Sequence, residues 1–161
     1  MRWTHPIEGF ISPGEFIPLA EKTGLITELS RWALKEAIGQ CAQWQLAENS
    51  VGVSVNLSCR CLTEPDMIDL IAELLSSSGL EPGQLTVEVT ESLFMEQSEQ
   101  VIEALTRLRG MGVFVSIDDF GTGYSSLSYL RKLPVDELKI DQSYIFPIRE
   151  QTGSDDCPRD C

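Results

Sequence analysis

Apolar residues recur at two spacings along the chain, and each spacing predicts one kind of secondary structure. Spacings of three and four residues predict helices, which run from Ser12 to near Gly24 and over residues 27–45, 65–77, 96–109 and 125–131. Short β-branched segments predict strands, over residues 51–56, 85–90, 113–118 and 135–141. Helices and strands therefore alternate along the chain.

This alternation predicts βαβ units and a parallel sheet, hence an α/β fold. A doubly wound sheet and a TIM-type β/α barrel both fit the order of elements. No Gly-x-Gly-x-x-Gly follows a predicted strand, which disfavours the dinucleotide-binding form of the doubly wound sheet. A barrel needs eight strands, and four are predicted here, so we expect a partial barrel over residues 1–150. Residues 151–161 have no apolar periodicity, and we expect them to be disordered.

Composition and charge narrow the classes of function. The 161 residues suit one domain, and no apolar run reaches the ~18 residues needed to cross a membrane. The N-terminus has no apolar core of the secretory type, so we expect a cytoplasmic protein. A net charge of −13 argues against duplex DNA or RNA as a partner. It leaves open a small phosphorylated ligand bound through metal ions.

Polar residues stand at or near the end of each predicted strand: Asn56, Glu88, Asp118 with Asp119, and Lys139 with Asp141. Because the carboxyl ends of parallel strands meet at one edge of a sheet or barrel, these side chains are expected to converge there. Carboxylate and amide oxygens are hard ligands that suit Mg²⁺ or Mn²⁺. With a lysine nearby, they point to two-metal hydrolysis of a phosphate ester. The competing interpretation of each single acid is a loop cap or a solvated group.

Three further features of the sequence say less about function. The segment Asp119-Phe120-Gly121-Thr122-Gly123-Tyr124-Ser125-Ser126 fits a phosphate-binding loop, and it fits a tight turn before a helix equally well. His5 is the only histidine and precedes Pro6, so a surface or packing role is expected. The tryptophans at 3, 32 and 44 are expected in the core or at an interface.

Several motifs, in order, resemble the EAL domain family. They are Arg2-Trp3-Thr4-His5-Pro6, Val55-Asn56-Leu57-Ser58, Glu88-Val89-Thr90-Glu91-Ser92, the Asp118–Ser126 segment and Leu138-Lys139-Ile140-Asp141. The resemblance covers roughly residues 2–150. It implies a β/α barrel that hydrolyses cyclic-di-GMP to pGpG with Mg²⁺ or Mn²⁺.

The resemblance also implies a role for each matching residue. Asn56, Glu88 and Asp118 would bind one metal ion and Asp119 a second. Lys139 would lie beside the nucleophilic water, Glu91 would steady the loop after Asp119, and Arg2 would contact a substrate phosphate.

The resemblance further implies an incomplete copy of the domain. The family's signature glutamate would precede Met1, and another metal-binding glutamate would follow Asp141. We therefore expect either a phosphodiesterase domain or an inactive module that binds cyclic-di-GMP or a protein partner. An unrelated metal-dependent barrel enzyme is a third interpretation. The open edges of a half barrel also predict aggregation of an isolated monomer, or association with a second copy or with the missing barrel half.

Overall fold

A computed structural model describes residues 1–47, 51–91, 99–121, 130–131 and 133–144. The predicted tail at 151–161 and most of the predicted helix at 125–131 lie outside these residues. Within them, no helix is long and apolar enough to cross a membrane.

Four parallel strands form the central sheet in the order β3-β4-β5-β6. They are β3 (Val53–Asn56), β4 (Leu85–Thr90), β5 (Phe114–Phe120) and β6 (Glu137–Ile140). This confirms the predicted α/β fold with a parallel sheet. In the described part of the chain, β3 and β6 are the edge strands.

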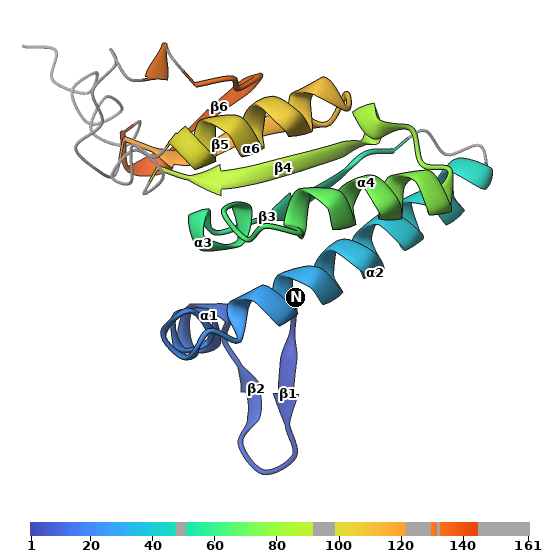
Figure 1. The fold of residues 1–161 in the computed structure, drawn as a ribbon. Coiled ribbons are helices and arrows are strands. Elements are labelled where there is room, and N and C mark those ends of the chain that lie inside the picture. The colour runs from blue at the N-terminus through green and yellow to red at the C-terminus, as the bar shows by residue number, and fades with distance from the viewer. Residues whose placement is uncertain (48–50, 92–98, 122–129, 132, 145–161) are drawn as a thin grey trace, which may run out of the picture.

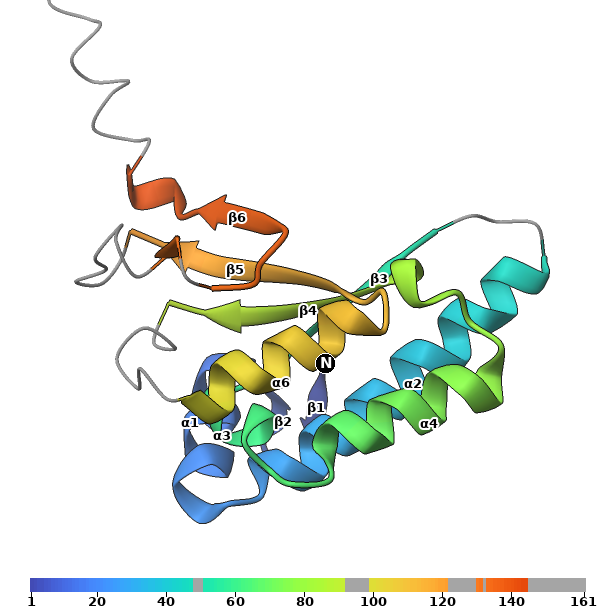
Figure 2. The same ribbon diagram turned by 45° about the horizontal axis from the view of Figure 1, so that its top comes forward.

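One face of the sheet is apolar and carries the helices (Figures 1 and 2). The strands alternate, and their buried residues on this face are Val55, Val87, Val89, Val115 and Ile117. The helices that cover it are α2 (Ile26–Leu46), α3 (Cys59–Leu62), α4 (Met67–Ser78) and α6 (Glu99–Gly110). Their apolar stripes complete one core with the strands.

The helix ends follow local sequence signals. The Ser12 hydroxyl accepts a hydrogen bond from the Gly14 N–H at 3.3 Å and caps α1 (Pro13–Thr23), a helix whose start at Ser12 was predicted. Gly24 and Gly79 end α1 and α4 with φ of 80° and 69°, a left-handed conformation that favours glycine. Short 3₁₀ turns occur at Pro82–Gln84 and Gln142–Tyr144.

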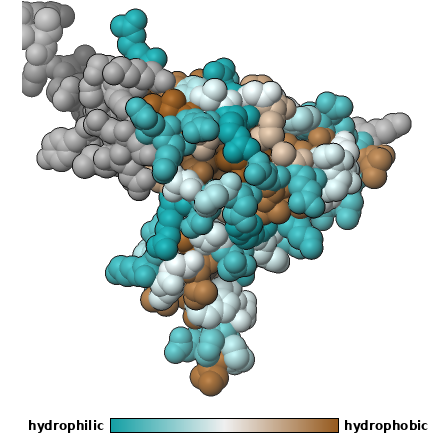
Figure 3. All heavy atoms as spheres, in the orientation of Figure 1, coloured by the Kyte–Doolittle hydropathy of each residue, from teal (hydrophilic) through white to brown (hydrophobic). Residues whose placement is uncertain are grey.

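An N-terminal hairpin was not predicted, because its strands are too short to show an alternation. It pairs β1 (Trp3–His5) with β2 (Gly9–Ile11) and extends away from the sheet and helices (Figure 1). His5 Nδ1 accepts hydrogen bonds from the N–H groups of Ile7 and Glu8, at 3.4 and 3.3 Å. His5 thus stabilises the turn, in agreement with a packing role. Apolar surface is visible at the far end of the hairpin (Figure 3).

Candidate functional site

The second face of the sheet is polar, and its side chains form a row across all four strands. Asn56, Glu88, Ser116 and Glu137 are neighbours in the strand register. Successive residues of a strand point to opposite faces, so this row lies opposite the face that packs against the helices. Apolar side chains that pack against the helices thus lie on one face of the sheet, and the predicted metal ligands Asn56 and Glu88 lie on the other.

Glu88 lies at the centre of this row and is 6% exposed. Asn56 Nδ2 donates to Glu88 Oε2 at 3.4 Å, and Lys139 Nζ donates to Glu88 Oε1. Burial acts to raise the pKa of Glu88, but hydrogen bonds from Lys139, Ser54 and Asn56 and the Lys139 charge outweigh it, so the pKa is lowered. The hydrogen bond to Glu88 in turn raises the pKa of Lys139. The pair is therefore a carboxylate and an ammonium at neutral pH.

A β-bulge at the carboxyl end of β5 places Asp118 and Asp119 at the same end of the sheet as Lys139. Ile117 pairs with Leu138 and Phe120 pairs with Ile140, so both aspartates lie opposite Lys139. Asp119 has a φ of 56°, a left-handed conformation that aspartate tolerates better than most residues. Its N–H donates to Asp118 Oδ1 at 3.0 Å.

Negative charge accumulates around this bulge. Burial raises the pKa of the Asp119 carboxyl, and the charges of Asp118 and Asp141 raise it further. Asp141 follows β6, where its N–H donates to the Phe120 carbonyl at 3.1 Å. Asp118 and Asp141, from two adjacent strand ends, thus both repel the charge of Asp119, and a bound cation would relieve that repulsion.

Glu91 joins the ends of two neighbouring strands. It is 5% exposed, and its Oε2 accepts a hydrogen bond from the Gly121 N–H at 2.9 Å. This contact fixes the first residue after β5, next to Asp119 and Phe120. The remainder of the predicted loop, residues 122–126, lies outside the described part of the chain.

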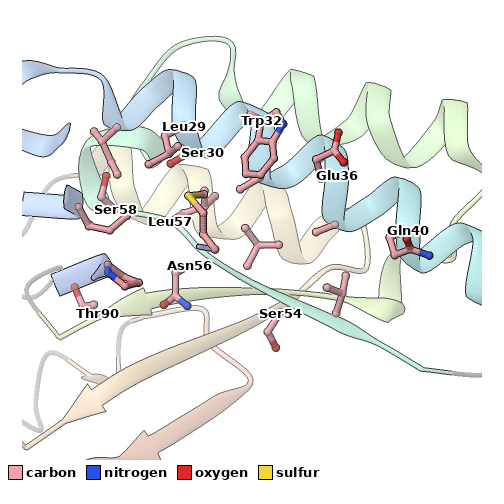
Figure 4. A pocket seen from close by; sticks show the side chains of 18 of the residues that line it. Leu29, Ser30, Trp32, Glu36, Gln40, Ser54, Asn56, Leu57, Ser58 and Thr90 are labelled. Carbon is pink, nitrogen blue, oxygen red and sulfur yellow. The ribbon is translucent and has the colours of Figure 1, made fainter. Parts of the chain in front are cut away.

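A hollow of about 790 Å³ adjoins this site on the β3 side. It lies between α2 and β3, and Figure 4 shows Trp32 from α2 above Asn56 and Thr90. Met1 also lines it, so the N-terminal segment reaches this end of the sheet. The neighbouring Arg2 is exposed, and no described contact joins it to the other predicted site residues.

The chemical types of the donor groups suit a hard divalent cation, but the donors in the described residues do not make a complete set of metal ligands. Glu88, Asp118 and Asp119 offer carboxylate oxygens and Asn56 an amide oxygen, which are the ligands of Mg²⁺ and Mn²⁺. The mutual repulsion at Asp119 also favours a cation there. Within the described residues, however, no three His, Cys, Asp or Glu side chains are grouped closely enough to form a ready metal site.

Two serines of this face were missed from the sequence. Ser54 lies two residues before Asn56 and hydrogen-bonds Glu88. Ser116 lies two residues before Asp118, is fully buried, and its hydroxyl has no partner among the described residues. The period of two along each strand could have identified both, since they share a face with the predicted ligands.

Comparison with known proteins places these features in a family. The family model described as EAL domain matches residues 1–156. The bifunctional diguanylate cyclase/cyclic di-GMP phosphodiesterase MucR of Pseudomonas aeruginosa is 46% identical over 146 residues, which is 90% of this chain and 21% of that protein. The cyclic di-GMP phosphodiesterase NbdA of the same organism is 44% identical over 92% of this chain and 19% of its own length.

Comparison with solved structures leads to the same family. The PaMucR phosphodiesterase in complex with c-di-GMP superposes with a TM-score of 0.84 at 44% identity, over 96% of this chain and 62% of that one. The EAL enzyme Bd1971, bound to cAMP and cyclic-di-GMP, gives a TM-score of 0.83 at 31% identity, over 92% of this chain and 42% of its own. This chain therefore spans 62% of the PaMucR structure and 42% of the Bd1971 structure. Both shares agree with a partial barrel. The chain belongs to the EAL domain family.

Proposed function

We propose that this chain is part of a cyclic-di-GMP phosphodiesterase domain, which hydrolyses cyclic-di-GMP to pGpG. The observation that supports this most is the polar row that joins Asn56, Glu88 and Lys139 beside the Asp118–Asp119 bulge. These residues match the family motifs, and the PaMucR structure is described as a c-di-GMP complex.

The proposal assigns a role to each group. Asn56, Glu88 and Asp118 would hold one Mg²⁺ or Mn²⁺ ion, and Asp119 a second. Such ions supply charge stabilisation at the phosphate and lower the pKa of water. Lys139 would orient water by hydrogen bonding and stabilise negative charge on the phosphate. Glu91 would keep the backbone after Asp119 in place, and Arg2 would pair with a substrate phosphate.

The test is incubation of the chain with cyclic-di-GMP and either Mg²⁺ or Mn²⁺, with pGpG followed by chromatography. The expected result is metal-dependent formation of pGpG that Asp118→Asn reduces to background. No pGpG under any metal, with a correctly folded chain, would contradict the catalytic proposal.

A binding module is the second candidate. It is favoured because the chain spans 62% of the PaMucR structure and because the described donors form an incomplete metal site. In this case isothermal titration would show binding of cyclic-di-GMP without turnover.

The edges of the sheet suggest how the domain is completed. Strands β3 and β6 are edge strands within the described residues, and unpaired edges of parallel sheets favour association. We propose that a second copy of the chain or the remaining barrel half covers them, and that the assembly acts in the cytoplasm. Light scattering of the purified chain would distinguish a homodimer from a monomer.

A further inference from the structure

The ion pair between Glu88 and Lys139 suggests a function beyond holding the sheet together. Glu88 is the most buried of the proposed metal ligands, and both of its carboxylate oxygens already accept hydrogen bonds. Oε1 accepts from the Lys139 ammonium and Oε2 from the Asn56 amide. Oε1 has a second lone pair, but a divalent cation bound there would lie beside the Lys139 ammonium, and the two positive charges would repel each other.

Lys139 is held in this position by the surrounding charge as well. Besides Glu88, the carboxylates of Asp118 and Glu137 attract its ammonium. Its side chain is 37% exposed, whereas that of Glu88 is 7% exposed. The ammonium thus provides the positive charge that a buried carboxylate requires.

We propose that Lys139 and a divalent cation compete for the same oxygen of Glu88, so that cation binding releases the Lys139 ammonium from the pair. This inference rests on the proposed metal site, and it adds that the metal ion binds before Lys139 takes part in the reaction. While Lys139 is paired with Glu88, fewer of its three ammonium N–H donors are available to orient water or stabilise a phosphate. Metal binding at Glu88 would therefore be what frees the lysine for the reaction.

The first test measures Mn²⁺ affinity of the full chain by isothermal titration. Lys139→Met removes the competitor and is expected to tighten Mn²⁺ binding at least about fivefold, the low end of measured couplings between linked ligands. Lys35→Met is the matched control, because Lys35 is an exposed lysine on α2 and its loss changes the net charge equally. This control is expected to leave the affinity within about twofold, because Lys35 is exposed to solvent and interactions between exposed charges are weak.

Lys139→Met leaves Glu88 without its ion-pair partner, and the chain could unfold as a result. A second variant that keeps the positive charge provides a test in that case. Lys139→Arg can hold both oxygens of a carboxylate and is expected to weaken Mn²⁺ binding. If Lys139→Met is folded by circular dichroism and binds Mn²⁺ no tighter than wild type, the competition is refuted while the metal site stands. If the wild-type chain binds no Mn²⁺, both the metal site and the competition are refuted.

A second measurement uses the wild-type chain alone. Reductive methylation of lysines, quantified by mass spectrometry, is expected to be faster at Lys139 with Mg²⁺ than without it. Lys35 serves as the internal reference. An unchanged or slower rate at Lys139, with Mg²⁺ bound, would contradict release of the ammonium.

Discussion

The two faces of the central sheet differ in what their residues do, although they alternate within the same strands. The face toward the helices consists of buried valine and isoleucine side chains, and it stabilises the fold. The other face carries Glu88 of β4, which accepts hydrogen bonds from Asn56 of β3 and Lys139 of β6. Substitution of a strand residue that faces the helices is therefore expected to lower the stability of the fold. Substitution of its neighbour on the polar face is expected to affect metal binding or to leave the stability unchanged.

Ile117 and Ser116 provide the sharpest contrast, because both are fully buried and adjacent in β5. Ile117→Ala removes core packing and is expected to lower the free energy of unfolding by about 2–5 kcal/mol. Ser116→Ala removes a buried hydroxyl without a partner among the described residues, so no loss of stability is expected. Urea denaturation measures both. Equal losses for the two variants would contradict the division between the faces.

Glu88→Gln tests the polar face directly. It preserves the shape of the side chain and removes the charge that pairs with Lys139. Mn²⁺ affinity is expected to fall about 10–100-fold, as is usual when groups that hold or orient metal ligands are changed. Titration calorimetry gives the affinity. A Mn²⁺ affinity equal to that of wild type would exclude Glu88 as a ligand.

Asp136 links the sheet to the end of α6 and should show the acid sensitivity of a structural carboxylate. It accepts hydrogen bonds from Arg109 Nε and from the Val115 N–H, both at 3.0 Å. Burial acts to raise the pKa of Asp136, and these bonds together with the Arg109 charge lower it overall. Asp136→Ala is expected to cost about 1–3 kcal/mol of unfolding free energy, since the Val115 donor loses its partner.

The sign of the pH dependence follows from that lowered pKa. The stabilisation by Asp136 is present above its unfolded pKa of about 3.9 and is lost as pH falls through the folded value. Asp136→Ala should therefore flatten the acid limb of a plot of stability against pH. Asp69→Asn, at an exposed ion pair with Arg107, is the control and should change stability by less than about 1 kcal/mol. An unchanged acid limb in Asp136→Ala would contradict this assignment.

Asp119→Asn has the smallest expected effect and the opposite sign. The raised pKa of Asp119 means that its charge destabilises the fold as pH rises above the unfolded value. In chelator at pH 7, Asp119→Asn is expected to raise the unfolding free energy by about 0.2–1 kcal/mol, the range for neighbouring charge pairs on a sheet. Asn tolerates the positive φ, whereas Asp119→Ala adds backbone strain and serves as the comparison. Destabilisation by Asp119→Asn in thermal melts would show that the repulsion is unimportant.

Much of the fold was predictable because its signals are local. The helix that starts at Ser12 and ends near Gly24, and the strand at Leu85–Thr90, depend on neighbouring residues, and the structure confirms them. Alternation along β4 also predicted that Glu88 and Val87 would lie on opposite faces. The strand β5 extends two residues beyond its predicted end, because the bulge carries the pairing through Asp119 to Phe120.

The arrangement within the site was less predictable, because it depends on contacts between distant residues. The sequence indicated that Asn56, Glu88 and Lys139 would share one edge of the sheet. It did not indicate that Glu88 would be bonded on both oxygens, since this depends on the register of all four strands. The left-handed backbone of Asp119 likewise coincides with the bulge between β5 and β6, a feature of the register that the sequence did not indicate.

Paramagnetic broadening by Mn²⁺ is the most direct test that the proposed metal ligands and Lys139, which come from all four strand ends, lie close to the bound ions. In ¹H–¹⁵N spectra of the chain, substoichiometric Mn²⁺ is expected to broaden first the amides of residues 56, 88, 118, 119 and 139. The amides of α4, on the helical face, should keep their intensity. Broadening that begins elsewhere, or that affects only one of these strand ends, would contradict the account.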